Sequence, residues 1–195
     1  MPKWRLSDDD LRAMYVGGRA TDEAKWYSRR WGAVFATGLA PRRWVRLEVP
    51  GRRTGRLQRV PVGLADVDGR WYLVSMLGEC HWVKNVRANG HRLVLRRGRP
   101  LECTAVEVPV PARGPILRRY VDVAPGGRPH ITVPRGSSVA AFQAVAGDYP
   151  VFEVCRVGPD GAAHPLRPPR SWFPLAVAGL ATAGCVARRT RWRRR

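Results

Sequence analysis

The sequence predicts an α+β fold, mainly β, in which short helices cover a small antiparallel barrel. Five or six short strand-like runs follow one another between residues 43 and 157, and turn sequences such as Asp66-Val67-Asp68-Gly69 and Gly98-Arg99-Pro100 separate them. The helical inserts between the runs are short, whereas a doubly wound parallel sheet alternates each strand with a helix. The pattern therefore favours a barrel, and 195 residues suffice to bury its core.

The N-terminal 40 residues predict two helices. Ser7, which three aspartates follow, is typical of a helix N-cap, and we expect the first helix to run to about Val16, where two glycines end it. Thr21 begins a second, longer helix. Its tryptophans Trp26 and Trp31 recur at helical spacing and are expected in the core.

The expected strands share an alternating or continuous apolar run, and they cover residues 43–49, 59–65, 70–76, 92–97, 101–108 and 151–157. Short helices are expected over residues 79–88, 116–123 and 138–146. We therefore divide the chain into N-terminal helices over residues 1–40, a barrel domain over residues 41–157, a linker rich in Pro, Gly and Ala over residues 158–170, and an apolar segment with an arginine-rich tail over residues 171–195.

The charge of the chain points to an anionic partner. The formal net charge is +20 and the isoelectric point is about 11.5, and arginine carries almost all of the positive charge. The four cysteines include no Cys-x-x-Cys spacing, so neither a metal site nor a disulfide framework is predicted. The N-terminus has no apolar leader, which makes the cytoplasm the expected location.

Two blocks of the sequence carry the chemistry. The first, Gly51-Arg52-Arg53-Thr54-Gly55, follows a strand-like run and combines glycines with forked guanidinium donors, which suits a phosphate or a carboxylate. The second, Trp82-Val83-Lys84-Asn85-Val86-Arg87-Ala88-Asn89, is expected on a short helix after a hairpin. Together the blocks predict a pocket for a planar, polyanionic cofactor.

With Pro61 between these blocks, the sequence resembles the deazaflavin-dependent nitroreductase family, whose members include quinone and nitro-compound reductases that use coenzyme F420. The resemblance covers residues 30–157. It implies a split β-barrel of the FMN- and deazaflavin-binding type, which agrees with the strand pattern. It also implies an oxidoreductase that transfers a hydride from reduced coenzyme F420 to a quinone-like or nitro-compound acceptor.

The resemblance also assigns residues to the cofactor site. Those that would hold the phosphate end of the cofactor are Arg52, Arg53 and Thr54. Those that would pass along the deazaflavin ring are Gln58, Arg59, Val60, Pro61, Val62 and Gly63. Those that would line its other side are Val74, Ser75, Met76 and Leu77, and those that would complete the cleft are His81, Trp82, Val83, Lys84 and Asn85. The alternative interpretation of Trp82 is that it packs in the core and does not line the cofactor site.

The residues after the predicted hairpin depart from the family pattern. They read Ser75-Met76-Leu77-Gly78-Glu79, where the better-known nitroreductases carry Ala-Ser-Lys-Gly-Gly. The missing lysine and the displaced serine favour quinone reduction over nitroreduction. Ser75 and Tyr149 are the candidate catalytic proton donors, with Tyr120 as a further one, and His130 is either an ordinary loop histidine or part of the acceptor site.

Three alternative functions remain open at this point. A reductase of the same fold that binds FMN would be yellow as isolated, and a carrier of haem, lipid or cofactor would lack catalysis. A nucleic-acid-binding protein would use the arginines, but the sequence has no RNA-recognition, zinc-finger or helix-turn-helix signature, so nucleic acid is not the expected partner. Split barrels often pair, which leaves a homodimer open as well.

The C-terminal residues suggest contact with a membrane. Trp172–Ala187 is uncharged and would be about 24 Å long as a helix, against a hydrocarbon core of about 30 Å, so that spanning is marginal. Trp172, Trp192 and the terminal arginines suit anionic headgroups. The alternatives are an anchored tail, a tail that lies on the inner face of the cell membrane, and a mobile basic tail.

Overall fold

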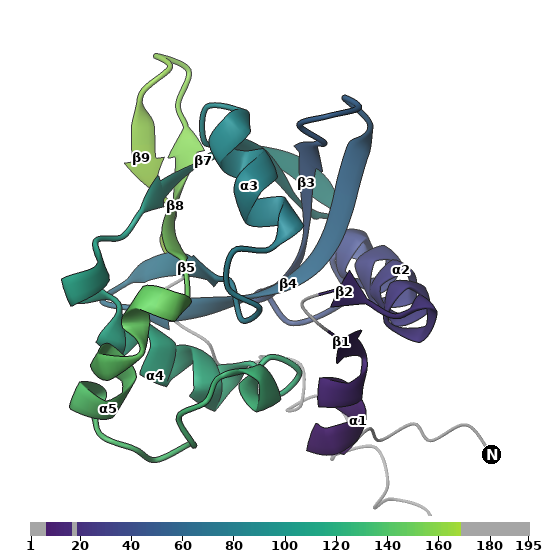
Figure 1. Ribbon diagram of the computed structural model, residues 1–195. Helices are drawn as coiled ribbons and strands as arrows, with labels where there is room; N and C mark the ends of the chain where they lie inside the picture. Colours follow the sequence, from purple (N-terminus) through teal and green to yellow (C-terminus); the bar gives the residue numbers. More distant parts are fainter. Residues whose placement is uncertain (1–6, 17–18, 169–195) are drawn as a thin grey trace, which may run out of the picture.

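Six antiparallel strands close into a barrel in the computed structural model, which describes residues 7–16 and 19–168 (Figure 1). The barrel strands are β3 (Trp44–Pro50), β4 (Leu57–Val67), β5 (Arg70–Val74), β6 (Arg92–Arg97), β7 (Arg99–Glu107) and β8 (Val151–Val157). They are hydrogen-bonded in the order β5-β4-β3-β6-β7-β8, and the pairing of β5 with β8 closes the ring. The predicted barrel is therefore confirmed.

The β4–β5 hairpin is tighter than the sequence predicts. The expected turn spans residues 66–69, but Asp66 still pairs with Trp71 and Val67 with Arg70. The turn is confined to Asp68 and Gly69, which both have positive φ angles of 49° and 70°. An Asp-Gly pair in this conformation matches the right-handed twist of the two strands, so the strands extend to the turn itself.

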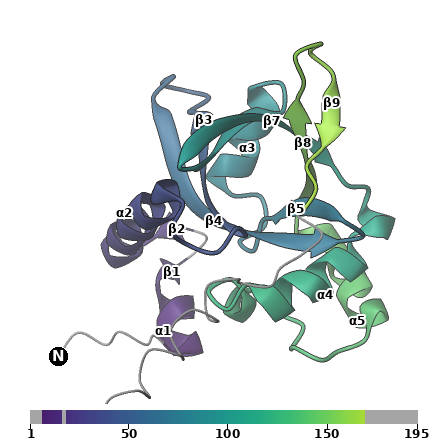
Figure 2. The same ribbon diagram turned by 180° about the vertical axis from the view of Figure 1, so that it is seen from behind.

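Helix α2 (Asp22–Thr37) packs against the outer surface of β3 and β4, as Figure 2 shows from behind. Its buried residues are Ala24, Gly32 and Phe35, and of these Gly32 lies against Arg46 and Pro61 and Phe35 stacks on Trp44. Trp26 and Trp31 are 46% and 51% exposed, so the prediction that they belong to the core is wrong. Gly32 allows the helix to approach the barrel closely, and the two exposed indoles lie outside this contact.

The first helix ends earlier than predicted. Helix α1 (Asp8–Ala13) begins with a capping box between Ser7 and Asp10, but Tyr15–Val16 forms strand β1, which pairs with β2 (Arg19–Ala20). The predicted helix to Val16 is therefore wrong in its last turn. The backbone N–H of Thr21 donates to the carbonyl of Met14, which is buried, and this contact turns the chain back on itself. The two glycines at 17 and 18 lie outside the described residues.

Two apolar clusters hold the domain together. One fills the barrel, and its fully buried members include Leu47, Leu73, Val83 and Phe152; helix α3 (His81–Ala88) lies across one end of the barrel and contributes to this cluster. The other lies between the barrel and a helical layer. This layer comprises α4 (Gly114–Val123), α5 (Val139–Ala144) and the single turns η1 (Val110–Ala112), η2 (Arg128–His130) and η3 (Ala146–Asp148).

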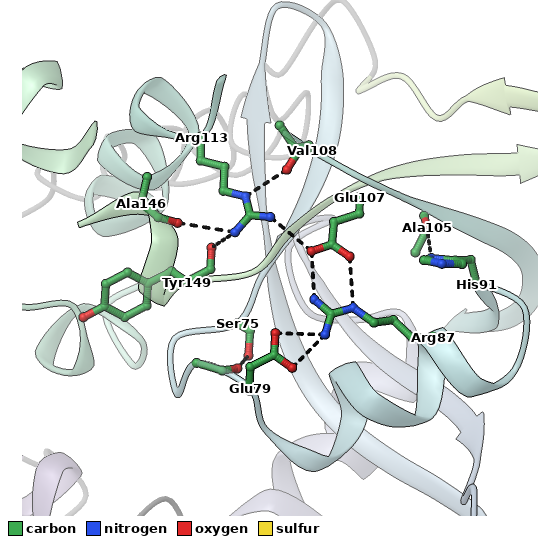
Figure 3. A network of polar contacts seen from close by, with 11 residues as sticks. Ser75, Glu79, Arg87, His91, Ala105, Glu107, Val108, Arg113, Ala146 and Tyr149 are labelled. Atoms are coloured by element: carbon green, nitrogen blue, oxygen red, sulfur yellow. Dashed lines mark hydrogen bonds and ion pairs between the residues drawn. The ribbon is translucent and has the colours of Figure 1, made fainter. Parts of the chain in front are cut away.

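A chain of ion pairs anchors the helical layer to the barrel (Figure 3). Arg113 is 6% exposed and donates to the backbone carbonyls of Val108, Ala146 and Tyr149 at 2.8–3.3 Å. Its remaining Nη2 donates to Glu107 at 3.1 Å, and Glu107 also accepts two hydrogen bonds from Arg87 of α3. Arg87 in turn binds Glu79 at 2.7 Å. The network thus ties β7, α3 and the helical layer into one unit.

The C-terminal part of the described chain continues the sheet. Within the predicted linker, Ala163–Pro165 forms strand β9 on the edge of β8, and the N–H of Leu166 donates to Val154. Leu166 packs against the barrel core and so holds this segment to the barrel. No helix among the described residues is long and apolar enough to cross a membrane. The predicted apolar segment Trp172–Ala187 and the arginine-rich tail lie outside the described residues.

Replacing Arg113 by leucine is expected to lower the free energy of unfolding by about 3–5 kcal/mol, because three buried carbonyls and Glu107 lose a charged donor. Urea denaturation followed by circular dichroism measures the change. The matched variant Arg118→Leu, at an exposed position of α4, should change it by about 0.5 kcal/mol or less. Equal losses in the two variants would contradict the anchoring role.

The network also predicts how stability depends on pH. Hydrogen bonds from Arg87 hold the pKa of the Glu107 carboxyl below its ordinary value of 4.5, so the unfolded chain binds more protons than the folded protein below that pH. The contribution of Glu107 is therefore complete above pH 4.5 and is lost as the pH falls through the lowered pKa. Urea midpoints between pH 7 and pH 3 should fall less steeply for Glu107→Gln than for the wild type. Glu102→Gln, at an exposed position on β7, serves as the control.

Candidate functional site

The two sequence blocks meet at one end of the barrel. The first block forms the turn between β3 and β4, where the N–H groups of Gly51 and Gly55 bond back to Arg56 and Gly51 at 2.9 and 2.8 Å. Arg52 reaches from this turn to α3, where its backbone N–H and its Nη1 both donate to Asn85 Oδ1 at 3.2 and 2.9 Å. Asn85 is only 4% exposed. One buried amide oxygen therefore joins residues that lie 33 positions apart.

The turn presents unpaired positive charge to solvent. Arg52, Arg53 and Arg56 are exposed, and within residues 7–16 and 19–168 no carboxylate lies within ion-pair distance of any of them. Thr54 supports the turn, since its hydroxyl oxygen accepts from the N–H of Arg56 at 3.3 Å. Guanidinium groups without a protein counter-ion fit the phosphate end of an anionic cofactor.

Strand β4 continues from the turn with the residues expected along the deazaflavin ring. Gln58 and Arg59 are exposed, and the four residues that follow, Val60, Pro61, Val62 and Gly63, are half-buried. The side chain of Trp44 crosses Gly63 so closely that a Cβ added there would lie 2.8 Å from Trp44 Cζ3. Only glycine fits at this position, which gives the residue a packing role as well.

Of the five predicted site residues on α3, some face solvent or the β3–β4 turn and the others pack in the barrel core. His81 and Lys84 are exposed, and Asn85 binds Arg52. Trp82 and Val83 instead belong to the barrel core, where the Trp82 ring lies 5.8 Å from that of Phe152. The core alternative for Trp82 is thus confirmed, and the two residues support the helix from beneath.

The candidate proton donors are held by other groups. Ser75 is 1% exposed, and its hydroxyl donates to the Gly78 carbonyl at 2.6 Å (Figure 3) and lies 3.2 Å from Cys80 Sγ. The Tyr149 hydroxyl accepts from the N–H of Thr132 and donates to the His130 carbonyl at 3.3 Å. Neither hydroxyl proton is free in this arrangement.

Tyr120, the third candidate, is buried, and its hydroxyl donates to Met76 Sδ at 3.7 Å. Burial raises the pKa of the Tyr120 phenol, which makes it a poorer acid. Tyr120 therefore supports Met76 from within the second apolar cluster.

A pocket of about 340 Å³ opens beside the loop that follows β5. Its lining residues come from that loop, from β1, from η2 and from the end of η3, and they are Tyr15, Met76, Leu77, Gly78, His130, Asp148 and Tyr149. The sequence analysis named Met76, Leu77, His130 and Tyr149 as candidates but missed three residues, which are Tyr15, Gly78 and Asp148. Tyr15 was assigned to a helix, and no signal distinguished Asp148 from an ordinary loop residue.

His130 is the least satisfied polar group of this pocket. Its Nε2 atom is buried and has no hydrogen-bond partner among the described residues, and its ring lies edge-on to Tyr15 at 5.1 Å. Burial, and then the nearby charge of Arg12, lower the pKa of His130, so the imidazole is neutral at pH 7. Burial is also the main reason why the pKa of Tyr15 is raised.

The chain is similar to known proteins in the following ways. A family model described as F420H2-dependent quinone reductase matches residues 21–132, whereas a search of curated proteins finds no match. Among solved structures, an F420H2-dependent reductase (FDR-A) is 23% identical over 58% of this chain and 94% of its own, with a TM-score of 0.39. An F420 reductase is 14% identical over 66% and 94%, with a TM-score of 0.37.

A domain-swapped dimer is 19% identical over 68% of this chain and 99% of its own, with a TM-score of 0.41. The family model covers more than half of the 195 residues, and the closed antiparallel barrel agrees with it. The predicted resemblance is confirmed: the chain belongs to the F420H2-dependent quinone reductase family, oxidoreductases of the split-barrel fold whose cofactor is coenzyme F420.

Proposed function

We propose that the turn at Gly51–Arg56 holds the anionic end of coenzyme F420, and that the pocket at the loop after β5 receives a quinone-like acceptor. The observation that carries this proposal is the double hydrogen bond from Arg52 to Asn85, because it joins the two sequence blocks into one surface. Reduced deazaflavin supplies a hydride when it is bound, so the protein has to bind and orient the reacting pair and keep water out.

The cofactor-binding residues are proposed by their position around this surface. Arg52, Arg53 and Thr54 would hold the anionic end, with Lys84 and His81 exposed on the neighbouring helix. The ring would lie along the β4 residues 58–63, and Met76 and Leu77 would face it from the loop after β5. Orientation of two bound reactants in this manner can lower a barrier by about 7–11 kcal/mol.

His130 is the residue that we propose for proton delivery to the acceptor. Hydride addition to a quinone leaves charge on its oxygen. The neutral imidazole can take up a proton from water at its unbonded ring nitrogen and pass that proton to the oxygen, which returns His130 to its neutral form. Ser75 and Tyr149, the donors predicted from sequence, would then position the site. Ser75 fixes the loop at Gly78, and Tyr149 holds the backbone of His130.

The acceptor is proposed to be a quinone and not a nitro compound. Leu77 lines the pocket at the position where the nitroreductases carry lysine, so this wall is apolar. Tyr15 and Met76 add further apolar surface. The same pocket also has polar lining residues, among them His130 and Asp148, so a flat ring that carries polar oxygens suits it.

Peripheral membrane contact is a second proposal, because it would bring a lipophilic quinone close to the enzyme. The exposed side of α2 supports it: Trp26 and Trp31 are half exposed, and the Arg30 guanidinium lies 4.7 Å from the centre of the Trp26 ring. Tryptophan with arginine suits the headgroup region of an anionic bilayer. A cytoplasmic location and a homodimer stay predictions, and FMN is the alternative cofactor.

Oxidation of reduced coenzyme F420, followed by absorbance with a panel of quinones and nitroaromatics, tests the proposed function. Quinones should be reduced faster than nitroaromatics. A protein that is yellow as isolated and reduces quinones only with FMN would overturn the proposal in favour of the alternative.

Removing two charges from the turn is expected to weaken cofactor binding. The variant Arg52→Gln/Arg53→Gln should raise the Kd for coenzyme F420 by about 100-fold, since each charge-assisted hydrogen bond contributes about 1.5–3 kcal/mol. Titration followed by the deazaflavin fluorescence measures the Kd. Arg92→Gln/Arg118→Gln removes the same charge at exposed positions elsewhere and should leave it within about twofold. An unchanged Kd for the variant Arg52→Gln/Arg53→Gln would contradict the assignment of these arginines to the cofactor site.

The roles of His130 and Tyr149 are separable by kinetics. His130→Leu should lower kcat with a quinone by about 100-fold while the Kd for the cofactor stays constant, because only proton delivery is lost. Tyr149→Phe should keep the pH profile of kcat and lose about 1 kcal/mol of stability with its two hydrogen bonds. If Tyr149→Phe lowers kcat and His130→Leu leaves it unchanged, Tyr149 and not His130 is the proton donor.

A further inference from the structure

A second pocket lies at the other end of the barrel from the proposed cofactor site. Its volume is about 260 Å³, and it shares no lining residue with the first pocket. Val45, which lines it, lies near the start of β3, while Pro50 at the end of the same strand leads into the turn. Five residues of extended strand separate these two positions by about 17 Å. The second pocket and the β3–β4 turn therefore lie at opposite ends of the barrel.

The floor of this second pocket is apolar. It consists of side chains from five strands and from the segment after β9, and they are Val45, Leu64, Trp71, Leu95, Leu101 and Leu166. All six pack in the core that fills the barrel, and the first four are less than 9% exposed. An apolar group that enters the pocket would therefore extend the barrel core.

Arginines line the same pocket. Arg97 and Arg99 lie on the β6–β7 hairpin, and Arg42 and Arg167 come from two other parts of the chain. In the part of the chain that the structure describes, none of them has a carboxylate within ion-pair distance, although other barrel arginines do, such as Arg46 and Arg96 on Glu48.

Arg97 also has a hydrogen-bond donor without an acceptor among the described residues. Its Nη2 donates to the Ala40 carbonyl at 2.8 Å, but its Nε–H is buried and unbonded among the described residues. A buried donor without a partner is costly, and four like charges around one pocket repel one another. A bound anion would satisfy the donor and relieve the repulsion.

From this arrangement we infer that the arginine-lined pocket is a binding site for an amphiphile with one anionic headgroup and a short apolar chain. The headgroup, a carboxylate or a phosphate, binds the guanidinium groups, since their forked donors match its oxygens. The chain lies on the floor of core residues, where burial of each CH₂ group is favourable. This site is separate from the proposed reductase chemistry and does not depend on it.

Octanoate tests the inference on the full chain without cofactor. Titration followed in ¹H–¹⁵N NMR spectra should shift the amide signals of residues 97–99 and 166–167, with at least tenfold tighter binding than acetate or 1-octanol. Octyl phosphate in a parallel titration distinguishes the two headgroups. Equal affinity for octanoate and acetate, or for octanoate and octanol, would overturn the inference, as would shifts confined to residues 51–56.

The variant Arg97→Gln/Arg99→Gln should raise the Kd for octanoate at least tenfold and leave the Kd for coenzyme F420 unchanged. Arg92→Gln/Arg118→Gln, which has the same net charge, should bind octanoate like the wild type. If both double variants lose the same affinity, the binding is a general effect of charge and the assigned site is wrong. Because cofactor binding is measured separately, a failure of this site and a failure of the proposed function give different results.

Discussion

The contact between Arg52 and Asn85 is the interaction on which the proposed site depends. Asn85 Oδ1 is buried between the turn and α3 and accepts two hydrogen bonds from Arg52, one of them from its guanidinium. Helix α3 cannot shift easily, because Val83 and Val86 are fully buried in the barrel core and Arg87 is bound to Glu107. The arginine-rich turn is therefore fixed to a rigid element, and this preorganisation lowers the cost of binding an anion.

The large positive charge of the chain separates into two kinds of arginine. Some are structural: Glu48 accepts from Arg46 and Arg96, and Glu107 binds Arg87 and Arg113. Others have no counter-ion among the described residues, and several of these gather in two places, the β3–β4 turn and the opposite end of the barrel. Unpaired charge at two ends of one barrel is expected of a protein that binds two anions, and it accounts for part of the net charge without invoking nucleic acid.

The sequence predicted the barrel and the turn well, because strand alternation, the Asp-Gly hairpin and the Gly-Arg block are local signals. It failed where long-range packing decides. Trp26 and Trp31 have the spacing of a core stripe, but Gly32 and Phe35 of α2 face the barrel instead. The hydroxyls of Ser75 and Tyr149 looked free, and only the folded chain shows the carbonyls that accept from them. The contact of Arg52 with Asn85 also needed the fold, since the two residues lie 33 positions apart.

A double-mutant cycle between Arg52 and Asn85 tests the central claim most directly. The Kd for coenzyme F420 is measured for the wild type, Arg52→Met, Asn85→Leu and the double variant. If the two residues act as one unit, the double variant should lose little more affinity for the cofactor than the single variant with the larger loss. The coupling energy between the two residues should then be about 1 kcal/mol or more. Losses that simply add would show that the turn and α3 act independently, which would contradict the account.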